Sequence, residues 1–89
     1  MATVLVAESF VRDMGQVYSE RIENKIYDLV ESLERFPELG VVDVRPSIRA
    51  RFGGSVHKLV VGPFDLFYRY DASCDEVHVD ALVSQRAII

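Results

Sequence analysis

The sequence has 89 residues, of which 49% are hydrophobic and 27% are charged, and its formal net charge at pH 7 is −4. A chain of this length forms one domain, because it buries only roughly 60 to 70% of its unfolded surface around a single core. The composition excludes intrinsic disorder, and the negative charge argues against tight binding to nucleic acid, which usually needs a positive excess. We therefore expect a single folded domain over residues 1–89.

The sequence contains no apolar run long enough to cross a bilayer, and its N-terminus lacks the basic head and long apolar core of a signal peptide. We expect a cytoplasmic protein that does not bind membranes. Cys74 is the only cysteine, so the chain can form neither an internal disulfide nor a thiolate metal cage, and an inert thiol is expected. His57, His78 and Asp80 lack the short ligand spacing of a metal site. We expect no metal and no cofactor.

The first forty residues predict a strand followed by helices. Val4–Val6 is a short apolar run typical of a buried strand. Apolar residues then recur at helical intervals from Phe10 to Tyr18, with Gly15 as a break. The most regular helical spacing follows, at Ile22, Ile26, Leu29, Val30, Leu33 and Phe36. Ser19 is expected to cap this second helix, and Pro37 is expected to end it.

The second half of the sequence predicts a β-meander. Residues 41–54 combine a proline, two adjacent glycines and three arginines with weak alternation, which predicts an irregular connection with or without a short strand. Three alternating runs follow, at Val56–Val61, Phe64–Tyr70 and Val77–Val83. Gly62-Pro63 and Asp71–Asp75, which separate these runs, are turn sequences.

The predicted order is an N-terminal strand, a helical hairpin or bent helix, a connection and a three-stranded antiparallel meander. This order defines an α+β domain with helices on one face of a four-stranded sheet. Since a helical crossover separates the first strand from the meander, that strand can lie parallel to one of the others. Tyr68 and Tyr70 share a strand face with Phe64 and Leu66, so we expect core packing beneath the helices rather than base stacking.

Several short strings resemble the RelE/ParE superfamily, the toxins of bacterial type II toxin–antitoxin modules, which include plasmid-stabilisation proteins. The strings are Leu33–Gly40 at the helix end, Val56–Phe64 through the hairpin, Leu66–Tyr70 in the next strand and Ala81–Arg86 near the C-terminus. With the order of elements, the resemblance spans almost the entire chain. It implies a toxin that inhibits growth when free and is neutralised by a cognate antitoxin protein.

The resemblance leaves two branches open. RelE-like members cut messenger RNA on the ribosome with basic residues, whereas ParE-like members inhibit DNA gyrase and usually lack that set. Lys58 matches a lysine that RelE-like enzymes use, and Arg86 matches an arginine near the end of the last strand. Asp65 stands where most members carry arginine, Ser84 stands where many carry histidine, and the sequence ends at Ile89 without a terminal tyrosine. These departures favour a ParE-like inhibitor that works by binding protein.

An mRNA interferase is the alternative function, and a non-toxic interaction domain of the same fold is a third. Cleavage needs a base for the 2′-hydroxyl, cations for the charge that builds on the phosphate, and an acid for the leaving oxygen. The candidate catalytic residues are Lys58, Arg69 and Arg86, which together could hold one phosphate. We favour the alternative that they are solvated strand residues, which limit aggregation at a sheet edge. His57 and His78 are conceivable general bases, but the sequence places no carboxylate or hydroxyl at a spacing that would mark either histidine as catalytic.

Overall fold

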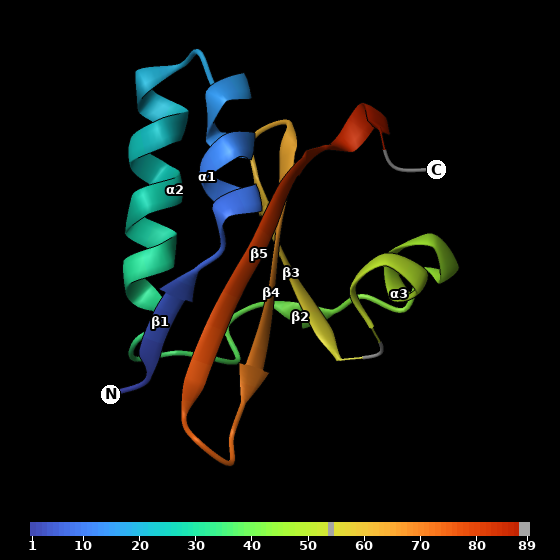
Figure 1. Cartoon of the computed structure of the whole chain (residues 1–89). Coiled ribbons are helices and arrows are strands. Elements are labelled where there is room, and N and C mark those ends of the chain that lie inside the picture. Colours follow the sequence, from blue (N-terminus) through green and yellow to red (C-terminus); the bar gives the residue numbers. More distant parts are fainter. Residues whose placement is uncertain (54, 88–89) are drawn as a thin grey trace.

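The computed structural model describes residues 1–53 and 55–87, which fold into a five-stranded sheet with helices (Figure 1). The strands are β1 (Thr3–Val6), β2 (Val41–Val42), β3 (Val56–Val61), β4 (Phe64–Asp71) and β5 (Glu76–Ser84). The helices are α1 (Glu8–Asp13), α2 (Glu20–Ser32) and α3 (Pro46–Phe52), with the short 3-10 helices η1 (Met14–Gln16) and η2 (Gln85–Ala87). None of the helices in residues 1–53 and 55–87 is long and apolar enough to cross a bilayer.

The sheet has the strand order β1-β5-β4-β3-β2. β3, β4 and β5 form the antiparallel meander that the alternating runs predict. β1 pairs parallel to β5, with Val4 opposite Val77, which agrees with the helical crossover between them. The β4–β5 register shifts between Phe67 and Tyr68, where Asp80 is the extra residue of a bulge in β5. Figure 1 shows α1 and α2 together on one side of this sheet.

α2 forms where the apolar spacing predicts a helix. It begins at Glu20, and the Ser19 hydroxyl caps it by accepting a hydrogen bond from the Ile22 amide at 3.3 Å. The helix ends at Ser32, earlier than the apolar spacing predicts, and Phe36 is 60% exposed. After Ser32 the chain tightens into a turn, in which the Glu34 and Arg35 amides donate to the backbone oxygens of Glu31 and Ser32. Pro37 then prevents a further helical turn, because it disfavours helical backbone at the residue before it.

The main core lies between the sheet and the helices α1 and α2. Its fully buried residues include Ile26, Leu33, Leu66, Tyr68, Val77 and Val79. Tyr68 is therefore in the core as expected, whereas Tyr70 is only partly buried and packs against the edge of this cluster. The Tyr68 hydroxyl accepts a hydrogen bond from the Gly40 amide at 2.8 Å. A side chain at Gly40 would lie 2.7 Å from the backbone oxygen of Lys58, so glycine is required for this close approach.

The connection before β3 is more ordered than the sequence indicated. β2 adds a fifth strand of two residues at the edge, with Val41 opposite Lys58, to the four that were expected. α3 is a helix where irregular chain was expected. Pro46 at its first position is compatible with a helix start, and Gly53, with φ of +96°, follows its end. Gly54, the last residue of the expected connection, lies outside the described residues, as do residues 88 and 89.

α3 covers the sheet face opposite to α1 and α2 (Figure 1). Its residue Ile48 is buried and forms a second, smaller core with Val56 and Phe67. The ring of Phe52 stacks on the ring of Phe67 with their centroids 5.0 Å apart. Helices therefore lie on both faces of the sheet, which corrects the expectation of helices on one face only.

Replacing Tyr68 with Phe should destabilise the domain, because the part-buried Gly40 amide would lose the hydroxyl to which it donates. We expect a loss of about 1 to 2 kcal/mol, or a fall in Tm of roughly 5 to 15 °C. Thermal unfolding followed by circular dichroism measures this change. Tyr70→Phe is the matched control, since its hydroxyl donates to Asp75 at an exposed position and its loss should shift the Tm far less. Equal shifts for the two variants would contradict the prediction.

Candidate functional site

The sheet face beneath α3 carries the charged strand residues that the sequence singled out. Lys58 on β3 lies directly opposite Phe67 on β4, and residues directly opposite on paired strands share a face. Because side chains alternate along a strand, Asp65 and Arg69 lie on the same face as Phe67. The register places His78 of β5 opposite Arg69, and therefore on this face as well. α3 and the segment before it cover part of these residues.

Arg45 joins the segment before α3 to the middle of the sheet. Its Nε atom donates to both carboxylate oxygens of Asp43 at 3.0 Å, and its Nη2 atom also donates to Asp65 at 3.3 Å. Gln85 in η2 donates to the other oxygen of Asp65 at 3.1 Å. Asp43 and Asp65 are 4% and 3% exposed, whereas the Arg45 side chain is 36% exposed. We call Asp43, Arg45, Asp65 and Gln85 the Arg45 clamp.

Within the Arg45 clamp, Asp43 and Arg45 form an ionised pair. Hydrogen bonds from Arg45 hold the pKa of Asp43 below its ordinary value, and the nearby charges of Arg45 and Lys58 act in the same direction. The hydrogen bonds to Asp43 in turn raise the pKa of Arg45. One guanidinium therefore serves two buried carboxylates, so the clamp offers no free positive charge for an anionic ligand.

Arg69 is also paired. Its Nε and Nη2 atoms donate to the two carboxylate oxygens of Asp80 at 2.7 and 3.0 Å, and this pairing raises the pKa of Arg69. The Ser9 hydroxyl donates to the backbone oxygen of Asp80 at 2.7 Å and ties the β5 bulge to α1. A surface hollow of about 250 Å³ adjoins this pair and is lined by Ser9, Arg51, Phe52, Arg69 and Asp80.

The structure brings together two of the three predicted catalytic residues. Lys58 and Arg69 are diagonal neighbours on adjacent strands of one face, and Lys58 forms no ion pair within residues 1–53 and 55–87. Arg86 lies in η2, which follows the end of β5 that pairs with Phe64. Phe64 precedes Arg69 by five residues of strand, which is roughly 17 Å. Arg86 is therefore at the far end of the sheet from Arg69.

The two histidines lie on opposite faces of the sheet. His57 stacks on the core residue Tyr68 with ring centroids 5.1 Å apart, and its Nδ1 atom is buried without a hydrogen-bond partner among the described residues. On the face beneath α3, the Nε2 atom of His78 lies 3.4 Å from the Oε1 atom of Glu76.

Cys74 has an unreactive thiol. The thiol donates a hydrogen bond to Glu76, and this bond raises the pKa of the thiol to about 11, which disfavours the reactive thiolate. The described part of the chain contains no cluster of three or more His, Cys, Asp or Glu side chains that could hold a metal ion.

The sequence reasoning did not identify the Arg45 clamp. Asp65 was noted only as a change of charge relative to a family position, although it lies in a strand between the apolar residues Phe64 and Leu66. A carboxylate within such a run needs a buried cationic or hydrogen-bonding partner. That requirement was a usable signal, but the sequence could not reveal that the partner is Arg45, twenty residues earlier.

No protein-family model matches the sequence, and no curated protein matches it significantly. Among solved structures, the fold is similar to a chain of the toxin–antitoxin complex RelBE2 from Mycobacterium tuberculosis, with a TM-score of 0.74 and 20% sequence identity. The match covers 94% of this chain and 98% of that chain. The protein therefore has the same fold as that chain, which agrees with the fold that the sequence resemblance implied.

Replacing Arg45 with Met should destabilise the domain, because Asp43 and Asp65 would stay buried without their shared cation. We expect a loss of about 2 to 3 kcal/mol, less than for a fully buried pair because Arg45 is 36% exposed. Denaturant unfolding measures this loss. The control is Arg49→Met on the exposed surface of α3, which should change stability by less than about 0.5 kcal/mol. Similar losses for both variants would contradict a specific role of Arg45.

The lowered pKa of Asp43 predicts a dependence of stability on pH. The folded state favours the ionised carboxylate of Asp43. The contribution of this carboxylate to folding stability is therefore fully present above its ordinary pKa of 3.8, and it is lost as the pH falls through the lower pKa that Asp43 has in the folded protein. The stability difference between the wild type and Asp43→Asn should therefore narrow as the pH is lowered below about 4. Denaturant titrations at a series of pH values measure this difference. Parallel stability curves for the two proteins would contradict the prediction.

Proposed function

We propose that this protein is the toxin of a bacterial type II toxin–antitoxin module and is neutralised by a cognate antitoxin protein. The observation that carries the proposal is the structural match along 94% of the chain to a chain of a toxin–antitoxin complex. That similar chain was solved in complex, which supports an antitoxin as the partner here. One fold can serve several functions, so the mode of action has to be argued from the site.

For the mode of action we favour a ParE-like inhibitor that binds a protein target such as DNA gyrase. An RNA phosphate requires free positive charge on the protein. On the face beneath α3, Arg69 is held by Asp80, and Arg45 is held between Asp43 and Asp65. These arginines are already paired with carboxylates, and this pairing supports recognition of a protein rather than cleavage of RNA.

The alternative is a ribosome-dependent mRNA interferase that uses Lys58, Arg69 and Arg86. One observation favours it: Lys58 is a diagonal neighbour of Arg69 and forms no ion pair within the described chain. A phosphate bound there would have to compete with Asp80 for the guanidinium of Arg69. Arg86 would also have to reach the phosphate from the other end of the sheet. We therefore rank this function second.

Inducible expression of the chain alone in a bacterial host should stop growth, and co-expression of the neighbouring reading frame as an antitoxin should restore it. Plasmid supercoiling should fall soon after induction, while ribosome-bound messages stay intact. Growth curves, supercoiling gels and mapping of message ends measure these outcomes. Unchanged growth together with no co-purifying partner protein would contradict the toxin assignment and favour a non-toxic interaction domain.

The Lys58→Ala/Arg86→Ala double variant separates the two modes of action. A protein-binding inhibitor should keep its toxicity, whereas an mRNA interferase should lose both toxicity and message cleavage. The matched control is Arg21→Ala/Lys25→Ala, which removes the same charge from exposed positions on α2. Selective loss of message cleavage in the first variant would overturn the ParE-like assignment.

A further inference from the structure

The bulge in β5 leaves one charged side chain outside the regular pairing of the sheet. The register pairs Val79 and Ala81 with consecutive residues of β4, so Asp80 between them has no residue opposite it. A bulge redirects the side chain of its extra residue, because the alternation of the strand is interrupted there. The carboxylate of Asp80 contacts the guanidinium of Arg69 instead of a cross-strand partner.

Three side chains of α1 and η1 hold the backbone around this bulge. The Ser9 hydroxyl donates to the backbone oxygen of Asp80 at 2.7 Å, and the Asp13 carboxylate accepts a hydrogen bond from the Leu82 amide at 3.0 Å. The Gln16 side chain donates to the backbone oxygen of Leu82 at 2.8 Å. β1 does not extend this far along β5, so these side chains provide hydrogen bonds that a neighbouring strand would otherwise make. The fold therefore fixes the position of Asp80 independently of its ion pair.

The Asp80 carboxylate occupies donors of Arg69 that suit an anionic ligand. The Nε and Nη2 atoms of a guanidinium form a planar fork that fits two oxygens of one carboxylate or phosphate group. Asp80 fills both positions of this fork, at 2.7 and 3.0 Å. The Asp80 side chain is only 16% exposed, so water screens this contact less than it screens a fully exposed pair. A phosphate group can take the fork only by displacing a carboxylate that the backbone holds in place.

Without the charge of Asp80, Arg69 would belong to a site with two cations. The hollow beside the pair is also lined by Arg51 and Phe52, and Asp80 is the only carboxylate among the described residues that line it. Arg51 forms no ion pair with a described residue, and its guanidinium carbon lies 4.8 Å from the centroid of the Phe52 ring. Two guanidinium groups beside an aromatic ring suit single-stranded RNA, whose phosphates pair with arginine and whose bases stack on rings.

We propose that Asp80 is a specificity-determining residue, which masks Arg69 and prevents this site from binding the phosphate groups of RNA. A partner protein can still contact the face beneath α3, because recognition by shape and apolar contact does not require the guanidinium fork. The inference deepens the proposed protein-binding mode of action and rests on it, since it names the residue that excludes the competing ligand.

The test measures the binding of a short fluorescein-labelled single-stranded RNA to the purified full chain by fluorescence anisotropy. Asp80→Asn keeps the size of the side chain but removes its charge, and it should tighten binding by about tenfold or more, with a gain that shrinks as salt is raised. The matched control is Glu76→Gln, which removes the same charge from another position on β5 and should change binding by less than about twofold. Asp80→Asn/Arg69→Ala should lose the gain, whereas Asp80→Asn/Arg21→Ala, which has the same net charge, should keep it.

Equal gains in Asp80→Asn and Glu76→Gln would overturn the proposal, because binding would then follow net charge alone. A gain that persists without Arg69 would overturn it as well, and so would wild-type binding as tight as that of Asp80→Asn. Circular dichroism establishes that each variant is folded, and Asp80→Ala replaces Asp80→Asn if the latter does not fold. The growth assay tests the proposed function without RNA binding, so a toxin with an unmasked Arg69 and a non-toxic protein with a masked one give different results.

Discussion

The burial of β4 on both faces is the constraint on which the rest of this structure depends. Five consecutive residues of this strand, Phe64 to Tyr68, are buried. Because strand side chains alternate, no single layer of helices can cover all five. α1 and α2 cover Leu66 and Tyr68, and α3 covers Phe67 on the other face. The one charged residue among the five, Asp65, therefore needs a partner inside the protein, and Arg45 and Gln85 supply it.

This pairing links the architecture to function. Arg45 holds the segment before α3 against the sheet, and its positive charge also compensates the negative charges of the buried Asp43 and Asp65. Asp80 does the same for Arg69 at the β5 bulge. The positive charges of Arg45 and Arg69 are thus used within the protein, which is a physical reason to favour a protein target over an RNA phosphate. Lys58 on the sheet and Arg49 and Arg51 on α3 form no ion pair with a described residue and keep the nuclease alternative open to experiment.

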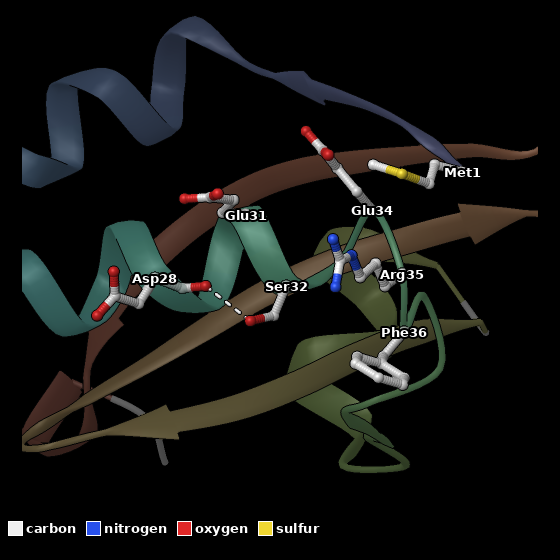
Figure 2. Close-up of a pocket in the computed structure, with 7 residues that line it drawn as sticks. All are labelled: Met1, Asp28, Glu31, Ser32, Glu34, Arg35 and Phe36. Carbon is white, nitrogen blue, oxygen red and sulfur yellow. Dashed lines mark hydrogen bonds between the residues drawn. The ribbon is translucent and has the colours of Figure 1, made fainter.

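The helical layer differs in electrostatic character from the face beneath α3. Glu31 near the end of α2 and Glu34 just beyond it form no ion pair with a described residue, and Arg35 lies in the same groove (Figure 2). Beneath α3, by contrast, Arg45 and Arg69 are each held by carboxylates.

The sequence by itself determined the elements whose periodicity is local. The apolar spacing of α2, the alternation in β3, β4 and β5, and the Ser19 cap predicted those elements, and the crossover predicted a parallel β1. Only the tertiary structure decided the roles of α3, β2 and Asp65. α3 and β2 are too short for periodicity to identify, and both are stabilised by contacts with the sheet. The partners of Asp65 lie twenty residues away on either side, and a pairing at that separation exists only once the chain has folded.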